Sequence, residues 1–291
     1  WNLIKEIPVS NKRIRCITFS SDSKLMAVAA DDYHITFYEM PEGNLVHKLE
    51  GITTYVDNII CSQSGNAEIV YSDGVVYRWN YTEHPELIDK QMHSCEFVVF
   101  ALYYVNIITF SSDGKYAIAY FEIDESTAVI NVYDTETQES IGSFRLSRLD
   151  IKTKGGIWQI LFFSDLQILI IKYSSDDLDI YNISDQKIIR KLRFVGDTPG
   201  PVAISSDKTL IAIGSCYDGS IEVYSISTGK QIWNQTAHSG DVKAISFCKY
   251  DKHIISGGED GAVRLWSLGM DSPLISFTRI KQDGVDKWVW S

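Results

Sequence analysis

The sequence predicts an all-β protein built from six repeats of a four-stranded antiparallel sheet. Three features of the 291-residue chain carry this prediction. A sequence unit recurs roughly every 40 to 50 residues, as expected for repeats of one supersecondary unit. Each unit contains four short apolar runs separated by turn residues. None of these runs has the period of an amphipathic helix.

Each unit begins with an apolar residue followed by a polar turn, and it reaches an aromatic residue about 20 positions later. The apolar residues are Phe19, Ile60, Phe110, Phe163, Ile204 and Phe247, and the aromatic residues are Tyr38, Trp79, Tyr133, Tyr181, Tyr224 and Trp266. The aromatic residue ends an alternating apolar run, such as Ala262–Trp266, and a fourth run follows it. This order predicts four strands in sequence, joined by tight turns as an antiparallel meander.

Six separate antiparallel sheets would each expose two edges and two faces. Packing the sheets face to face around a closed ring covers the faces and leaves only short edges. The sequence therefore predicts a β-propeller that occupies residues 1–291 as a single domain. A linear β-solenoid is the competing fold, but its repeats are usually shorter and lack the four-run rhythm. Because the chain opens on Trp1 rather than Met, we expect a fragment of a longer protein.

The two ends of the chain look complementary. Residues 1–9 read as the last strand of a preceding unit, and residues 285–291 read as the first strand of a further one. We therefore expect six complete repeats and a partial seventh closing blade, with seven positions favoured over six. Two alternatives stay open: the intact protein continues past Ser291, or six blades close and the end strands cover a seam.

An aspartate precedes the aromatic residue by six positions in four units. These residues are Asp32, Asp73, Asp218 and Asp260, and glycine follows three of them. Aspartate suits a tight turn because its carboxylate accepts backbone N–H bonds, and glycine adopts positive φ without steric cost. The pattern indicates a structural turn between the second and third strands.

These residues resemble the WD40 repeat family, most closely in the segment 237–268. In that family His238, Ser256, Asp260 and Trp266 would form a hydrogen-bonded tetrad. The resemblance implies that the Trp266 indole meets Ser256, that Ser256 meets His238, and that Asp260 holds the other nitrogen of His238. The other five units keep the spacing but lack the histidine, and four of them replace the tryptophan by tyrosine.

A histidine, a serine and an aspartate also form the nucleophilic set of hydrolases. Here the serine is expected within a strand beside a tryptophan donor, which leaves no exposed nucleophile. The segment 227–233 resembles a repeat of quinoprotein propellers, but it occurs once and without cofactor ligands. The histidines are dispersed, and there is no phosphate-binding glycine loop. We therefore expect no enzyme activity, no cofactor and no metal.

The net charge of −11 repels phosphate backbones, which argues against nucleic acid as a partner. No apolar run is long enough to span a bilayer, so membrane insertion is not expected. The five cysteines are odd in number, lack a C-x-x-C pair and mostly lie in apolar runs. This usage favours a reducing, intracellular and cytoplasmic location.

The function that these features favour is a non-catalytic platform for binding other proteins, a scaffold or adaptor domain of a larger assembly. The alternatives are a sensor or regulatory propeller of a multidomain signalling protein and, less favoured, a quinoprotein-like or hydrolase enzyme. The loop 145–158 reverses the local charge, and family topology places exposed tyrosines on the same face. We therefore expect an acidic or phosphorylated segment of a partner to contact Arg145, Arg148, Lys152, Lys154, Trp158, Tyr33, Tyr55 and Tyr217.

Overall fold

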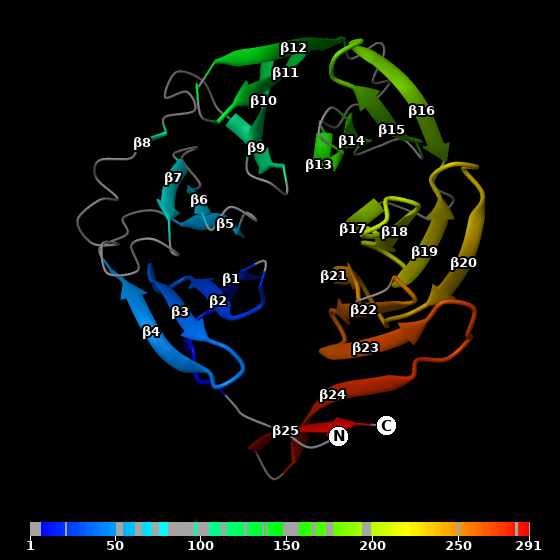
Figure 1. Cartoon of the computed structure of the whole chain (residues 1–291). Coiled ribbons are helices and arrows are strands. Elements are labelled where there is room, and N and C mark those ends of the chain that lie inside the picture. The colour runs from blue at the N-terminus through cyan, green and yellow to red at the C-terminus, as the bar shows by residue number, and fades with distance from the viewer. Residues whose placement is uncertain are drawn as a thin grey trace. The chain divides into compact units, whose positions relative to one another are not determined.

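A computed structural model shows a chain of antiparallel β-sheets (Figure 1). The structure describes residues 7–20, 22–50, 55–61, 66–71, 76–80, 96–97, 105–111, 115–124, 127–135, 137, 139–147, 157–164, 167–172, 177–193, 199–248, 251–282 and 285–290. The chain divides into two compact units, Trp1–Asp150 and Ile151–Ser291. That the two units form a single domain stays a prediction.

The first unit contains three four-stranded sheets with neighbouring strands in chain order. The first sheet consists of β1 (Ile14–Phe19), β2 (Leu25–Ala30), β3 (Ile35–Glu39) and β4 (Asn44–Leu49). The second consists of β5 (Val56–Cys61), β6 (Asn66–Tyr71), β7 (Val76–Asn80) and β8 (Glu96–Phe97). The third consists of β9 (Val105–Phe110), β10 (Tyr116–Asp124), β11 (Thr127–Asp134) and β12 (Ser140–Ser147).

The second unit contains three more sheets, the last of which has five strands. The fourth sheet consists of β13 (Ile157–Ser164), β14 (Gln167–Lys172), β15 (Asp177–Asn182) and β16 (Lys187–Arg193). The fifth consists of β17 (Pro199–Ile204), β18 (Leu210–Ser215), β19 (Ser220–Ser225) and β20 (Gln231–Thr236). The sixth consists of β21 (Val242–Phe247), β22 (His253–Gly258), β23 (Ala262–Ser267), β24 (Ile275–Gln282) and β25 (Val285–Trp290).

The predicted repeat matches these sheets element by element. The six apolar residues that open the units lie in the first strands, and the six aromatic residues lie in the third strands. Phe19 ends β1, for example, and Tyr38 lies in β3. The prediction of an all-β fold made of four-stranded antiparallel blades is confirmed.

A buried serine shapes the turn between the first two strands of several sheets. The hydroxyl of Ser20 accepts the N–H of Leu25 at 2.9 Å, and the hydroxyl of Ser205 accepts that of Leu210 at 2.8 Å. Ser111 makes the corresponding bond with Tyr116 at 2.9 Å. The recurring Ser-Ser-Asp sequence therefore encodes a hydrogen-bonded turn in which the serine satisfies a backbone donor.

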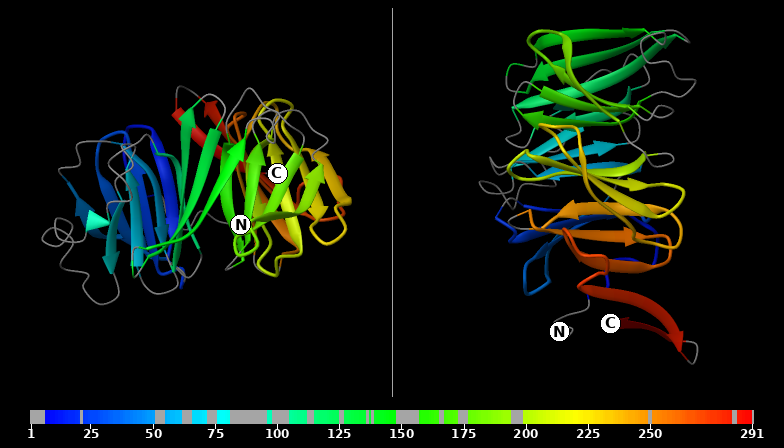
Figure 2. Two further views of the ribbon diagram at one scale, coloured as in Figure 1. Left: turned by 90° about the horizontal axis from the view of Figure 1, so that it is seen from above. Right: turned by 90° about the vertical axis from the view of Figure 1, so that its right-hand side faces the viewer.

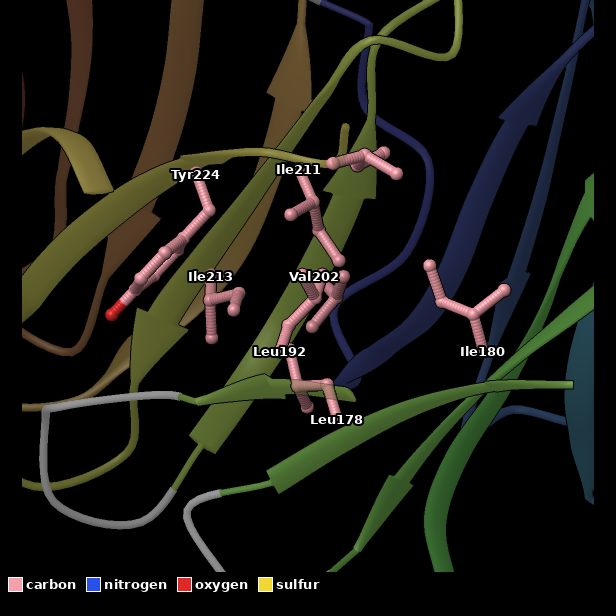
Figure 3. Close-up of a cluster of buried hydrophobic side chains, with 8 residues drawn as sticks. Leu178, Ile180, Leu192, Val202, Ile211, Ile213 and Tyr224 are labelled. Atoms are coloured by element: carbon pink, nitrogen blue, oxygen red, sulfur yellow. The ribbon is translucent and has the colours of Figure 1, made fainter. Parts of the chain in front are cut away.

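Within each unit, apolar cores lie between successive sheets. In the second unit, β15 and β16 contribute Leu178, Ile180 and Leu192 to one such core, and the facing fifth sheet contributes the other side (Figure 3). The fifth-sheet residues are Val202, Ile211, Ile213, Tyr224 and Ile226. Because both faces of a blade are covered, inner strands are buried along almost their whole length, as in β18.

The C-terminal strand differs from the expectation. We expected residues 285–291 to begin a new sheet, but β25 pairs antiparallel with β24, with Gln282 opposite Val285 (Figures 1 and 2). The two residues between these strands are Asp283 and Gly284, and Asp-Gly is among the strongest short-range signals for a hairpin. The prediction that this segment starts a further sheet is wrong, and a seventh blade is not confirmed.

The N-terminal segment was expected to form a strand over residues 1–9. Residues 1–6 lie outside the described part of the chain, and residues 7–9 are not in a strand. Instead, Ile7 and Val9 pack against a buried cluster of Met26, Val28 and Tyr38 in the first sheet. Their apolar side chains are better buried against β2 and β3 than they would be at a solvated edge.

Candidate functional site

Four side chains of the second unit form a continuous chain of hydrogen bonds at the sixth sheet. The Trp266 indole nitrogen donates to the Ser256 hydroxyl at 3.0 Å, and Ser256 Oγ lies 2.8 Å from His238 Nε2. His238 Nδ1 lies 2.9 Å from Asp260 Oδ1. These are the contacts that the WD40 resemblance implies, and they connect β22, β23 and the segment before β21.

The direction of these bonds fixes the proton on His238. The ionised Asp260 carboxylate can only accept, so the proton of neutral His238 lies on Nδ1, although Arg264 Nη1 also lies 2.7 Å from that nitrogen. Nε2 is then the acceptor, and Nδ1 carries the proton that is donated to Asp260. The network therefore selects the neutral Nδ1-protonated form of His238, and burial lowers the pKa of His238 in the same direction.

Asp260 is the point at which this network meets the backbone and Arg264. Its carboxylate accepts the N–H groups of Ser239 and Ala262 at 3.2 and 3.1 Å. Arg264 Nη1 lies 2.7 Å from Asp260 Oδ2. Although burial opposes ionisation, the bonds from Arg264, His238 and the backbone together hold the pKa of Asp260 well below its usual range.

This arrangement leaves no accessible nucleophile in the tetrad. Ser256 is 1% exposed and His238 is 4% exposed. The serine proton is engaged by His238, and its lone pairs face a tryptophan donor, so a substrate has no approach to Oγ. The geometry suits a buried clamp that ties two strands to the preceding loop.

The lowered pKa of His238 gives a pH-dependent stability. Below the ordinary value of 6.5, an unfolded His238 binds a proton, whereas the folded one stays neutral. The stabilisation is complete above that value and is lost as the pH falls toward the folded pKa, by at most about 1.4 kcal/mol per pH unit. We expect chemical unfolding at pH 7.5 and 5.5 to show this loss, and His238→Gln to flatten it. An unchanged slope in His238→Gln would show that other groups cause the pH dependence.

The same turn in the first sheet keeps only part of the tetrad. Asp32 accepts a bond from the hydroxyl of Ser10 at 2.7 Å, and these residues are 22 positions apart, as are His238 and Asp260. Ser10 therefore stands where His238 stands in the complete set. The histidine of the motif does not reveal Ser10, because serine stands at that position, but the 22-residue spacing to the aspartate does.

The residue after the aspartate adopts positive φ in three turns. Gly219 and Gly261 both have φ of 70°, and Tyr33 has φ of 60°. Glycine accepts this conformation freely, but a residue with a side chain pays about 1–2 kcal/mol in the left-handed region. The positive φ therefore lies at the residue after the aspartate, where Tyr33 replaces the glycine of the other two turns. Retained strain of this kind clusters at functional sites.

Tyr33 belongs to an exposed cluster of the first unit. Its ring stacks on that of Tyr55 with a centroid separation of 4.9 Å. The guanidinium of Arg15 lies 4.1 Å from the Tyr55 ring centroid and 2.5 Å from Asp31. A hydrogen bond with Tyr55 raises the pKa of Tyr33. Tyr33 is 39% exposed and Tyr55 is 37% exposed, so both rings remain available to a partner.

The structure places the other predicted contact residues unevenly. Arg145 lies exposed in β12, and Trp158 lies in β13. Arg148, Lys152 and Lys154 lie outside the described residues. Tyr217 is 73% exposed in the loop between β18 and β19 of the second unit.

Besides Ser10, three residues of these sites were not predicted from the sequence. Arg15 and Asp31 complete the tyrosine cluster, and Arg264 supports the tetrad. Arg15 and Asp31 come together only through the pairing of β1 with β2, so no sequence spacing indicates them. Arg264 lies four residues after Asp260 in the sequence, but that spacing has no special meaning in a strand.

Two features are absent from the described residues. No group of three or more histidine, cysteine, aspartate or glutamate side chains in this part of the chain is arranged to hold a metal ion. The described part of the chain also contains no helical segment with the length and hydropathy of a bilayer span.

Comparisons with known proteins agree with this geometry. The family model "WD domain, G-beta repeat" matches residues 1–39 and 229–267, which include the complete tetrad turn. Periodic tryptophan protein 2 of Saccharomyces cerevisiae is 20% identical over 92% of this chain, and human striatin is 21% identical over 91%. The chain spans 28% and 36% of the lengths of those two proteins.

A solved structure supports the fold. The computationally designed Ika8 protein superposes with a TM-score of 0.63 and 18% sequence identity. The match covers 97% of this chain and 85% of the designed protein. This likeness shows the fold, and the matches of residues 1–39 and 229–267 to WD40 repeats support the WD40 β-propeller family.

Proposed function

We propose that this chain is a non-catalytic platform to which other proteins bind, a scaffold or adaptor domain of a larger intracellular assembly. The observation that carries the proposal is the contrast between the tetrad and the tyrosine cluster. The reactive side chains are buried and fully engaged with one another, whereas rigidly held aromatic rings are exposed on loops. Exposed tyrosine beside arginine is typical of interface hot spots.

The fold supplies the physical basis of the proposal. Strand-to-strand loops are held at fixed positions by the blades and vary without disturbing the cores. A rigid loop cluster loses little entropy when a partner binds. The family alone does not identify a partner, so the identity of the assembly comes from experiment.

The test is reconstitution with a purified partner. Proximity labelling in cells would supply candidates, and calorimetry with the purified chain would measure a saturable affinity for each. A serine-hydrolase probe is the matched test of the enzyme alternative, and we expect it to leave Ser256 unlabelled. Probe labelling that His238→Gln abolishes, or the lack of any saturable protein partner, would contradict the platform proposal.

The loop at 145–158 remains a proposed contact. Reversal of Arg148, Lys152 and Lys154 to glutamate should weaken binding of the native partner tenfold or more, equivalent to about 1.4 kcal/mol. The melting temperature should not change, because charged loop residues contribute little to stability. Wild-type affinity in this triple variant would remove the loop from the binding face.

A further inference from the structure

We propose that Lys12, Arg13, Tyr33 and Tyr55 form a docking site for an acidic peptide segment that carries an aromatic residue. This inference rests on the proposed function and names the chemistry of the partner. The four residues belong to the first unit and together form the basic–tyrosine site.

Hydrogen bonds hold the basic segment beside the tyrosine turn. The Ser10 hydroxyl donates to Asp32, and the N–H of Lys12 donates to the Ser10 hydroxyl at 3.0 Å. The carbonyl of Arg13 accepts the N–H of Asp31 at 2.9 Å. Residues 10–13 are therefore fixed along the turn that presents Tyr33.

One of the three basic residues near this site is engaged in an ion pair, and the other two are exposed. Arg15 is paired with Asp31 and lies on the face of Tyr55. Lys12 and Arg13 are exposed, and among the described residues neither side chain makes an ion pair. In a chain of net charge −11, two cations on a segment held at the tyrosine turn, without an ion pair among the described residues, favour carboxylates of a partner.

The two stacked tyrosines are the reason to expect an aromatic residue in the partner. Tyr33 occupies a position where the fifth and sixth sheets have glycine, and its ring is stacked on Tyr55 rather than buried in a core. A bulky residue at this backbone conformation is retained where the side chain itself is needed. An aromatic side chain of the partner can pack on the exposed part of the stacked rings.

The binding experiment uses a fluorescein-labelled peptide with three glutamates on each side of one tryptophan, measured by fluorescence anisotropy with the full chain. One control peptide has glutamines in place of glutamates, and another has glycine in place of tryptophan. We expect both controls to bind at least tenfold more weakly, and the affinity of the parent peptide to fall as salt is raised.

Two variants test the residues. The double substitution Lys12→Glu/Arg13→Glu should weaken binding of the parent peptide tenfold or more. Its matched control is Lys24→Glu with Lys208→Glu, which makes the same change in net charge at exposed turns between first and second strands. Tyr33→Gly should also weaken binding tenfold, without lowering the melting temperature, because glycine relieves the positive φ.

The outcomes separate this inference from the platform proposal. Equal loss in the control variant, equal binding of the glutamine peptide, or no binding of the parent peptide would overturn the basic–tyrosine site. Preferential binding of a phosphoserine peptide, an RNA oligonucleotide or phosphatidylserine vesicles would also overturn it. If the native partner binds Lys12→Glu/Arg13→Glu with wild-type affinity, the site fails while the platform stands. If no protein partner binds the wild-type chain, the platform itself fails.

Discussion

Replacing Gly219 by alanine is expected to destabilise the fold by about 3 kcal/mol or more. Gly219 has φ of 70°, and an added Cβ would lie 2.0 Å from the His238 carbonyl oxygen and 2.6 Å from that of Gly240. Both obstacles are backbone atoms, so no side-chain rotation relieves the clash. The Gly219 carbonyl also accepts the N–H groups of Ala237 and His238, so a displaced turn disturbs the entry to the tetrad.

Gly261 provides a matched control for this prediction. It has the same φ of 70° at the corresponding position of the sixth sheet, and a Cβ there would meet nothing within 4 Å. Gly261→Ala should therefore cost only the strain of the left-handed conformation, about 1–2 kcal/mol. Equilibrium unfolding in urea measures both free energies. Equal losses in the two variants would show that the close approach at Gly219 relaxes without cost.

The strands could be predicted from the sequence because each unit repeats the same physical solution. A serine turn in several units, an aspartate turn in four and an aromatic residue in the third strand of all six mark the boundaries, as at Ser20 and Tyr38. The pairing of the C-terminal strand does not follow from the repeat pattern. The pattern of 285–291 fits an inner strand as well as a hairpin partner, and the Asp283-Gly284 signal decides between them.

The two sites also differ in how far the sequence predicts them. The tetrad follows from spacing within one repeat, so His238, Ser256, Asp260 and Trp266 could be named in advance. The contact between Tyr33 and Tyr55 joins loops of two successive sheets, and Arg15 joins it through strand pairing. Both tyrosines were expected on one face, but their stacking depends on packing between two repeats, and hydrogen bonds within the first sheet bring the basic residues to them. A single repeat does not encode that packing.

Replacing Asp260 by alanine is expected to reduce the free energy of unfolding by roughly 1 to 3 kcal/mol at neutral pH. The change removes the acceptor of His238 Nδ1–H, of two backbone N–H groups and of the Arg264 guanidinium. Thermal and urea unfolding measure the loss. Asp32→Ala is the matched control, because Asp32 accepts only from the Ser10 hydroxyl and the N–H of His34 in the described residues. Its cost should be smaller.

The pH dependence gives this prediction a second test. The folded state holds the pKa of Asp260 below the ordinary value of 3.8, so the carboxylate stabilises the fold fully above that value. The contribution is lost as the pH falls through the folded pKa, and the difference between wild type and Asp260→Ala should shrink there. Binding of the native partner should survive in the folded fraction of the variant. Loss of binding at an unchanged melting temperature would instead make Asp260 part of the binding surface rather than a clamp beneath it.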